Sequence, residues 1–263
     1  TELKKLFDEQ HVFDSPKPVK LLSRVLELGG LSEDDIVLDF FAGSGTTGHA
    51  AMERSVAGNA CRFILVQLPE PVESDQFQTI ADITRARLRR AMDSLSLPTL
   101  GETADFGFRV FKLDSSNIRA WNPNRDDLNG SLLDNLEHIQ PGRTDDDVLY
   151  EILLKLGLDL CVPIEMRSVA RVLSSSSTSG KNTESSFTVH SIGGGVLMAC
   201  LDASITVTDA EPLALGIVAW HKSLAPAGDT TCIFRDSAFE NDVAKSNLAA
   251  ILEQHGIKQV RSL

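Results

Sequence analysis

Apolar positions along the first hundred residues follow two patterns, which together predict an α/β arrangement. Helical spacing of apolar side chains predicts helices over residues 18–28 and 79–95, and residues 46–53 are also expected to be helical. Short apolar runs at residues 36–38 and 62–68 predict strands. The second run is continuously apolar, as expected of a parallel strand that is buried on both faces.

A change in composition between residues 97 and 105 predicts a domain boundary. One domain is therefore expected over residues 1–100, and a carboxyl-terminal α/β domain over residues 105–263. The serine-rich segment 174–180 is typical of a flexible loop within the second domain.

The second domain shows strand and helix patterns in turn. Residues 108–113 alternate between apolar and polar, which predicts a strand with one buried face. Residues 187–192 and 196–201 flank Gly193-Gly194-Gly195, a pattern typical of a β-hairpin. The other predicted elements are helices over residues 148–156, 211–224 and 236–252 and strands over residues 230–235 and 257–263. The acidic run 145–147 is expected to cap the first of these helices.

Composition bears on the cellular location of the chain and on whether it holds a metal or disulfides. The chain has 263 residues, a hydrophobic fraction of 42% and a formal net charge of −12. No apolar run is long enough to span a bilayer, and no signal peptide is visible, so a cytoplasmic location without membrane contact is expected. Cys61, Cys161, Cys200 and Cys232 are far apart, without a C-x-x-C pair. They are expected to be buried reduced thiols, and no metal site is predicted.

Basic side chains gather densely at one place only. Arg85, Arg87, Arg89 and Arg90 lie within the predicted helix 79–95. A solvated helix face is favoured for them over a phosphate-contacting face. The acidic net charge indicates that the main surface for gripping a nucleic acid, if there is one, lies elsewhere, because phosphate neutralisation requires clustered Lys and Arg. His49 is expected to be structural.

Residues 36–47, Ile-Val-Leu-Asp-Phe-Phe-Ala-Gly-Ser-Gly-Thr-Thr, form the strongest candidate for a binding site. An apolar strand ends in Asp39, a glycine turn follows, and a helix begins near Thr46. Gly43 and Gly45 let the backbone approach a ligand, because glycine has no Cβ and tolerates positive φ. The helix would point its free N–H groups at that ligand, and Asp39 would lie in the crevice at the end of the strand.

Two common phosphate-binding motifs fit this segment less well. A P-loop requires Gly-Lys-Ser/Thr, but Gly45 is followed by Thr46-Thr47. Gly43, Gly45 and Gly48 match the bare spacing of a dinucleotide fingerprint, yet that turn normally opens with glycine directly after the strand, where this chain has Asp-Phe-Phe-Ala. A nicotinamide cofactor is therefore kept as a weaker alternative.

The segment resembles the S-adenosylmethionine-binding motif of DNA amino-methyltransferases, Asp-Pro/Phe-Phe-x-Gly-Ser-Gly-Thr-Thr. Residues 13–18 match a second motif of that family, Phe-x-x-Pro-Lys-Pro, in the order and spacing that the family has. Along nearly its whole length the chain resembles the carboxyl-terminal half of the modification subunit of type III restriction-modification systems, which methylate adenine in DNA. The resemblance implies a Rossmann-like half-domain that binds S-adenosylmethionine, followed by an α/β domain for assembly or dimerisation.

The resemblance also implies which residues hold the cofactor. Phe13 would pack against its apolar parts, and Lys17 would meet its carboxylate. Many methyltransferases have an acid that takes the ribose hydroxyls; this chain has Gln67 there and Glu70 three residues later, and both stay open. The expected cofactor-binding residues are Phe13, Lys17, Asp39, Phe40, Phe41, Gly43, Ser44, Gly45, Thr46 and Gln67.

The methyl-transfer site itself is expected to be missing. In the family an Asp/Asn-Pro-Pro-Tyr tetrapeptide precedes the cofactor motif, holds the target amino group and stacks on the flipped base. No such tetrapeptide occurs in the 263 residues, and the family's target-recognition segment also lies upstream. No catalytic residue is therefore assigned, and the chain is expected to be inactive alone, with DNA contacted through the missing amino-terminal part.

Two classes of function follow from the resemblance. The chain is either the cofactor-binding portion of an adenine-specific DNA methyltransferase or a non-catalytic assembly module that acts mainly through its second domain. Modification subunits of the family dimerise and bind a helicase–nuclease restriction subunit. A homodimer and that restriction subunit are therefore the expected protein partners.

Overall fold

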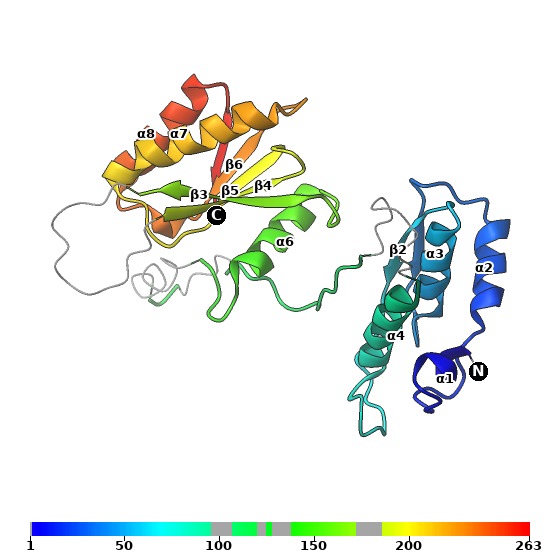
Figure 1. Cartoon of the computed structure of the whole chain (residues 1–263). Helices are drawn as coiled ribbons and strands as arrows, with labels where there is room; N and C mark the ends of the chain where they lie inside the picture. The colour runs from blue at the N-terminus through cyan, green and yellow to red at the C-terminus, as the bar shows by residue number, and fades with distance from the viewer. Residues whose placement is uncertain (1, 96–106, 120–124, 128–137, 172–185) are drawn as a thin grey trace. The chain divides into compact units, whose positions relative to one another are not determined.

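The computed structural model describes residues 2–95, 107–119, 125–127, 138–171 and 186–263. The chain divides into two compact units, Thr1–Val110 (unit 1) and Phe111–Leu263 (unit 2), which are coloured blue to green and green to red in Figure 1. The predicted domain boundary at 97–105 and the serine-rich segment 174–180 lie outside the described residues. None of the described helices is long and apolar enough to cross a membrane.

Unit 1 is built on two parallel strands, β1 (Ile36–Asp39) and β2 (Arg62–Leu65), which pair along their whole length. The crossover between them contains α3 (Thr46–Val56), so that β1, α3 and β2 form a βαβ unit. The predicted helices and strands of this half are confirmed. The other helices of the unit are α1 (Glu2–Leu6), α2 (Val19–Leu28) and α4 (Ile80–Leu95).

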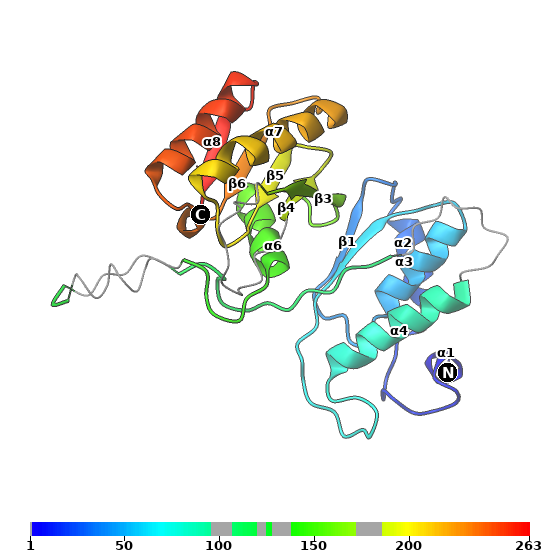
Figure 2. The same cartoon turned by 60° about the vertical axis from the view of Figure 1, so that its left-hand side comes forward.

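The helices of unit 1 pack on one face of this small sheet (Figure 2). Val37 and Phe63 contact a cluster formed by α2 and α3, which includes Leu26 and Ala50. Phe63 and Leu65 also contact a second cluster, formed by Met52 of α3 with Leu88 and Ala91 of α4. Alternate residues of β1 and β2 thus anchor three helices on the same side.

The opposite face of the sheet is apolar and, among the described residues of unit 1, uncovered. Its side chains are between 47% and 64% exposed: Ile36, Leu38, Ile64, Val66 and Leu68. The expectation that strand 62–68 is buried on both faces is therefore wrong for the described chain. Only one layer of helices is present, so alternate residues of the strand stay at the surface.

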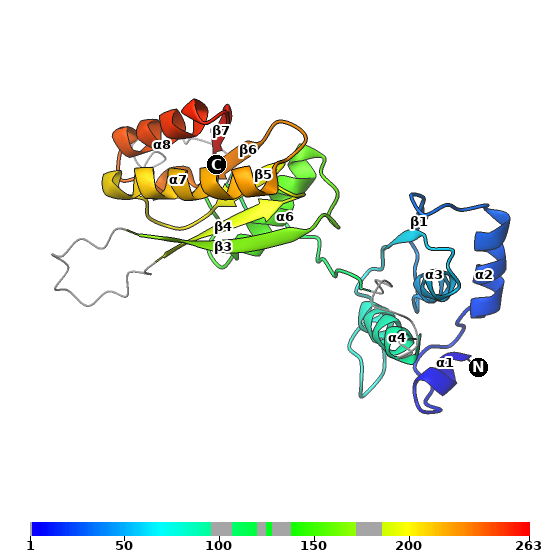
Figure 3. The same ribbon diagram turned by 45° about the horizontal axis from the view of Figure 1, so that its top comes forward.

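Unit 2 contains a five-stranded sheet in the order β3-β4-β5-β6-β7 (Figure 3). The pairs β3–β4 and β4–β5 are antiparallel, and β5–β6 and β6–β7 are parallel. The strands are β3 (Ile164–Ala170), β4 (Ser186–Ile192), β5 (Leu197–Cys200), β6 (Thr231–Phe234) and β7 (Gln259–Ser262). The helices are α6 (Asp145–Leu156), α7 (Val207–Leu224) and α8 (Asp242–Gln254), with a short 3₁₀ turn η1 (Asp236–Ala238).

The central strands of unit 2 are covered on both faces. On one face, β4, β5 and β6 pack against α7 and α8 through Phe187, Val189, Met198, Cys200, Cys232 and Phe234. On the other face the same strands pack against α6 through Ile192, Leu197, Ala199 and Ile233. Strict alternation along each strand places its side chains in two separate cores.

Most predicted elements of unit 2 are confirmed, including the hairpin β4–β5 with its triple glycine, but three helix starts differ. Helix α8 starts at Asp242 and not at residue 236, because the Asn241 side chain caps it and residues 236–238 form the separate turn η1. Helix α6 is capped by Thr144, in a capping box with Asp147, and not by the acidic run alone. Helix α7 starts at Val207 because Thr206 and Asp209 form a second capping box. It therefore includes Pro212, which the sequence pattern had placed at its start.

Three further expectations for this part of the chain are corrected. Residues 108–113 form no strand: Phe108 packs against the Leu88 cluster of unit 1, and the Phe111 ring lies 4.8 Å from that of Tyr150 in unit 2. Only Phe108 and Phe111 anchor this segment, while Val110 and Leu113 are exposed. Strand β3 was not predicted. Cys161 is exposed, although the other three cysteines are buried; all four are free.

Candidate functional site

The glycine-rich segment forms a tight turn between β1 and α3. Gly45 is the N-cap of α3 with a φ of 79°, and Gly43 has a φ of 53°. In this left-handed region a residue with a Cβ costs about 1–2 kcal/mol. Among the described residues no side chain caps this end of α3. The first N–H groups of the helix thus have no side-chain acceptor among the described residues, although the residues that carry them are buried.

Two polar side chains at the carboxyl ends of the strands hold this turn. The Asp39 carboxylate accepts hydrogen bonds from the Phe41 N–H at 3.1 Å and from the Thr47 hydroxyl at 2.6 Å. The Gln67 side-chain oxygen accepts a hydrogen bond from the Gly43 N–H at 2.7 Å. Both residues come from the predicted set, and both contact the turn directly.

The Phe-x-x-Pro-Lys-Pro segment lies against the same turn. A Cβ at Gly43 would lie 3.6 Å from the Phe13 ring, so the two are in contact. The Thr46 hydroxyl donates a hydrogen bond to the Lys17 carbonyl oxygen at 3.3 Å. The Lys17 side chain is exposed. The structure thus brings together the two motifs that sequence order had placed one helix apart.

Side chains of helix α4 donate hydrogen bonds to the turn. The Thr84 hydroxyl donates to the Gly43 carbonyl oxygen at 2.5 Å. Arg87 donates from one guanidinium nitrogen to the Ser44 hydroxyl at 2.9 Å and to the Thr46 hydroxyl at 2.6 Å. The side chains of Ser44 and Thr46 are consequently buried toward α4. Their hydroxyls are thus engaged by Arg87.

Burial changes the titration of the groups beneath the turn. Desolvation, with the nearby Arg87 charge, lowers the pKa of His49 to about 4, so its imidazole is neutral at pH 7. Its Nδ1 accepts a hydrogen bond from Arg87 Nε at 3.4 Å. Desolvation lowers the pKa of Arg87 to about 10, which leaves it charged at neutral pH. The expectation that His49 is structural agrees with these contacts.

The two phenylalanines of the turn differ from its buried polar groups. Phe40 and Phe41 are both exposed, and their ring centroids lie 5.1 Å apart in a tilted arrangement. Large apolar side chains in this position can offer a face to an aromatic or aliphatic ligand. In the described residues no group of three or more His, Cys, Asp or Glu side chains could hold a metal ion.

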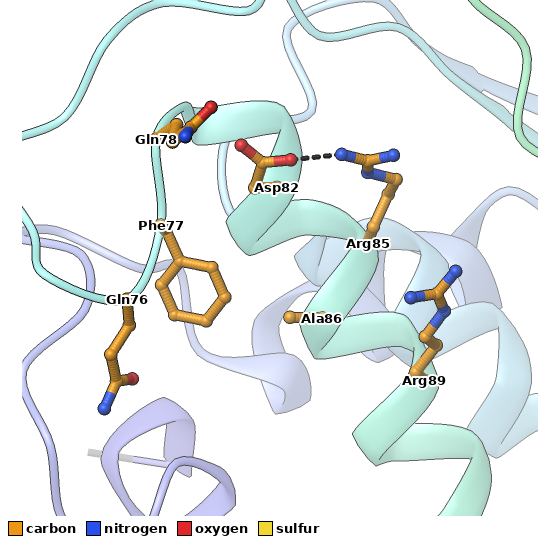
Figure 4. Close-up of a pocket in the computed structure, with 7 residues that line it drawn as sticks. All are labelled: Gln76, Phe77, Gln78, Asp82, Arg85, Ala86 and Arg89. Carbon is orange, nitrogen blue, oxygen red and sulfur yellow. Dashed lines mark hydrogen bonds and ion pairs between the residues drawn. The ribbon is translucent and has the colours of Figure 1, made fainter.

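The arginine cluster of α4 divides among several environments. Arg87 is buried, and Arg90 forms an ion pair with Asp8. Arg85, which is paired with Asp82, and Arg89 line a cleft of about 410 Å³ (Figure 4). The other lining residues are Gln76, Phe77, Gln78 and Ala86. None of the ten predicted cofactor residues lines this cleft, so it is separate from the glycine turn.

Sequence reasoning missed three residues that shape the turn: Thr47, Thr84 and Arg87. Arg87 had been grouped with exposed arginines. A usable signal was present, because Arg87 stands four residues after Ile83 and four before Ala91, both of which are buried. An arginine within the apolar stripe of a helix indicates a buried, hydrogen-bonded cation.

Comparison with known proteins connects unit 1 to a described family. A DNA methylase family model matches residues 2–58. The type III restriction-modification enzyme StyLTI Mod subunit of Salmonella typhimurium is 34% identical over 118 residues, which is 42% of this chain and 18% of that subunit. The EcoP15I Mod subunit of Escherichia coli is 36% identical over 120 residues, which is 43% of this chain and 17% of that subunit.

A relative from another class of enzyme shares the similarity. The type II methyltransferase M.KpnI of Klebsiella pneumoniae is 35% identical over 100 residues, covering 35% of this chain and 24% of its own length. The chain thus spans less than a quarter of the length of these relatives. The expected resemblance to modification subunits is confirmed for about two fifths of the chain.

Proposed function

We propose that unit 1, in which a DNA methylase family model matches residues 2–58, is the S-adenosylmethionine-binding portion of a DNA methyltransferase that methylates the amino group of adenine. The observation that carries the proposal is the turn itself, in which Gly43 and Gly45 adopt left-handed conformations at the uncapped start of α3. Such a turn allows close backbone approach and offers N–H groups to the carboxylate of the cofactor.

The neighbouring side chains suit the other parts of that cofactor. Lys17 is exposed beside the turn and can reach a carboxylate. Phe13, Phe40 and Phe41 supply apolar surface next to Gly43 for the adenosine and the carbon chain beside the sulfonium. The strand-and-helix order around the turn supports a Rossmann-like half-domain, with the ligand at the carboxyl ends of the strands.

The contacts of Gln67 help to choose between Gln67 and Glu70 as the residue that binds the ribose hydroxyls. Its side-chain oxygen is occupied by the Gly43 N–H, and its amide nitrogen donates to the Leu68 carbonyl oxygen at 3.1 Å. Glu70 is exposed three residues later. We therefore favour Glu70 as the group that accepts hydrogen bonds from the ribose hydroxyls, with Gln67 holding the turn.

The proposed methyltransferase is incomplete in these residues. Methyl transfer from the sulfonium is an in-line displacement that depends on positioning the target amino group, and no Asp/Asn-Pro-Pro-Tyr tetrapeptide occurs in the sequence. The apolar face of β1 and β2 also lacks a cover in the described residues of unit 1. Both observations support a chain that binds cofactor but needs the rest of a methylase domain for activity.

We further propose the partners that the similarity to Mod subunits suggests. DNA would be held by the part of the methyltransferase that this sequence lacks, and the restriction subunit and a second copy would be the protein partners. Unit 2, with its own two cores, is then the candidate for assembly contacts. Light scattering on the full chain tests the homodimer, which a monomer at micromolar concentration would contradict.

Calorimetry with the full chain tests the cofactor. We expect heat of binding with S-adenosylmethionine and none with NAD; the opposite result would establish the nicotinamide alternative. Asp39→Asn keeps the shape of the side chain but weakens acceptance from Thr47 and Phe41, so it should reduce affinity. Asp34→Asn is the matched control on the exposed approach to β1 and should bind as the unchanged chain does.

A methyl-incorporation assay tests the proposed incompleteness. With labelled S-adenosylmethionine and adenine-containing duplex DNA, the chain alone should transfer no methyl group. An intact DNA methyltransferase serves as the positive control. Transfer by the chain alone would contradict the proposal that the methyl-transfer site lies outside these residues.

A further inference from the structure

Arg87 combines a charge with almost complete burial. Arg87 is only 1% exposed, and its side chain is the largest of the fully buried side chains in the described residues. Charged side chains are rarely buried to this degree without a carboxylate partner. No ion pair joins Arg87 to a carboxylate in the described residues, and it donates hydrogen bonds to two hydroxyls and an imidazole.

The contacts of Arg87 converge on the glycine turn. Ser44 and Thr46, its two hydroxyl partners, stand on either side of Gly45. Helix α4 approaches the turn closely at the same place, since a Cβ at Gly45 would lie 3.0 Å from Thr84 Cγ2. Thr84 and Arg87 together donate hydrogen bonds to Gly43, Ser44 and Thr46, so the position of the turn depends on α4.

The charge of Arg87 adds to the field at the start of α3. The helix begins at Gly45 without a side-chain cap among the described residues, and its dipole contributes partial positive charge there. The His49 side chain, which accepts a hydrogen bond from Arg87, is neutral at pH 7. Glu2 and Glu53 act on Arg87 through space but form no ion pair with it. Arg87 is therefore a buried positive charge next to the turn, and the Asp39 carboxylate, which Phe41 and Thr47 hold, carries the opposite charge there.

We propose that Arg87 is a positioning residue of the cofactor site, which shapes the turn and makes it selective for a ligand whose end carries a carboxylate. The inference rests on the proposed function, in which this turn binds S-adenosylmethionine. It goes further by assigning the selectivity to a buried residue of α4 that touches the turn and not the ligand. Arg87 acts through Ser44, Thr46 and the field beneath them.

The test compares two ligands that differ only in the carboxylate. Calorimetry measures binding of S-adenosylmethionine and of decarboxylated S-adenosylmethionine to the full chain, to Arg87→Met and to Arg87→Lys. Arg89→Met is the matched control, because Arg89 lies on the same helix, is exposed and lines the separate cleft. Far-ultraviolet circular dichroism checks that each variant is folded.

The expected result is a loss of selectivity. Arg87→Met should weaken binding of S-adenosylmethionine by about 10–100-fold and change binding of the decarboxylated ligand by less than about threefold. Arg87→Lys, which keeps the charge, should retain part of the preference, and Arg89→Met should retain all of it. Equal losses for both ligands, or no loss, would overturn the inference while leaving the cofactor assignment intact.

A measurement without ligand separates this inference from the proposed function. Hydrogen exchange at the amides of Gly43, Gly45 and Thr46 should be faster in Arg87→Met than in Arg89→Met, because the turn loses two hydrogen bonds. If the unchanged chain binds neither ligand, the proposed function fails, and this exchange still decides whether Arg87 positions the turn. Unchanged exchange in Arg87→Met overturns that role.

Discussion

The two sheets of this protein differ in how their apolar faces are covered. In unit 2, alternate residues of β4, β5 and β6 point into two cores, one under α7 and α8 and the other under α6. In unit 1, helices pack on one face of β1 and β2, while Leu38 and its neighbours are exposed on the other. Parallel sheets are normally buried on both faces. The sheet of unit 2 thus has helices on both faces, whereas the described sheet of unit 1 has helices on one face only.

The start of α3 at the glycine turn differs from the helix starts that side chains cap. Thr144 and Thr206 close the starts of α6 and α7 with capping boxes. Gly45 leaves the start of α3 without a side-chain cap among the described residues. In unit 1 itself, Thr79 and Asp82 close the start of α4 with reciprocal hydrogen bonds. The uncapped start is thus a feature of the glycine turn and not of unit 1 as a whole.

A matched pair of leucine truncations should show the largest difference between the sheets. Leu197 of β5 is 1% exposed and Leu38 of β1 is 57% exposed, and each lies in a strand with a parallel neighbour. Leu197→Ala should lower the free energy of unfolding of unit 2 by about 2–5 kcal/mol, because it leaves a cavity in the core. Leu38→Ala should lower that of unit 1 by less than about 1 kcal/mol.

Urea denaturation measures both effects. Both tryptophans, Trp121 and Trp220, belong to the residue range of unit 2, so their fluorescence follows that unit. Methyl resonances of Ala50 and Ala91 follow unit 1. A loss of several kcal/mol in Leu38→Ala would show that the apolar face of β1 is already covered in solution, for example by a second copy of the chain.

Acid should destabilise unit 1 through His49. The pKa of this residue is lowered to about 4 in the folded chain by desolvation, against an ordinary value of 6.5. The unfolded chain therefore binds more protons between these values. The contribution of neutral His49 to the free energy of unfolding is fully present above pH 6.5. It is lost as the pH falls toward 4, and amounts to on the order of 3 kcal/mol over the whole window.

The pH dependence is measured by urea denaturation of unit 1 at several pH values between 4 and 7. His49→Gln should flatten the curve, since glutamine does not titrate. His255→Gln in unit 2, where the side chain is exposed, is the control and should leave the curve of unit 1 unchanged. The same slope in His49→Gln as in the unchanged chain would show that other groups cause it.

The smallest expected effect concerns the cap of α6. Thr144→Ala removes the hydroxyl that accepts from the Asp147 N–H and donates to the Asp147 carboxylate. Unit 2 should lose about 1 kcal/mol of stability, measured by tryptophan fluorescence in urea. Thr144→Ser, which keeps the capping box, should restore most of it. No loss in Thr144→Ala would mean that water caps this helix equally well.

Much of the local structure could be predicted because it depends on neighbouring residues. The hairpin around Gly193-Gly194-Gly195 and the turn at Gly43 and Gly45 follow from the freedom of glycine to adopt positive φ. The failures arose where distant residues decide the outcome. Alternation in residues 108–113 suggested a strand, but no neighbouring strand is present in the described chain to complete a ladder.

The candidate site shows the same division. Asp39, Gly43, Gly45 and Gln67 were predicted from the motif, and the structure brings them together at the turn. Arg87 could not be assigned in the same way, because its contacts with Ser44 and Thr46 join residues more than forty positions apart. Its spacing from Ile83 and Ala91 could have indicated that Arg87 is buried, but only packing shows which groups it contacts.

The amino-acid sequence by itself determined the order of helices and strands, the glycine turn and the likeness to DNA methylases, because these depend on residues close together in the chain. Only the tertiary structure decided which faces of the two sheets are covered, and that a buried arginine supports the turn. Whether a strand residue is buried depends on the helices that pack on both faces of its sheet. A run such as 62–68 therefore cannot show from its own composition whether a second layer of helices is present.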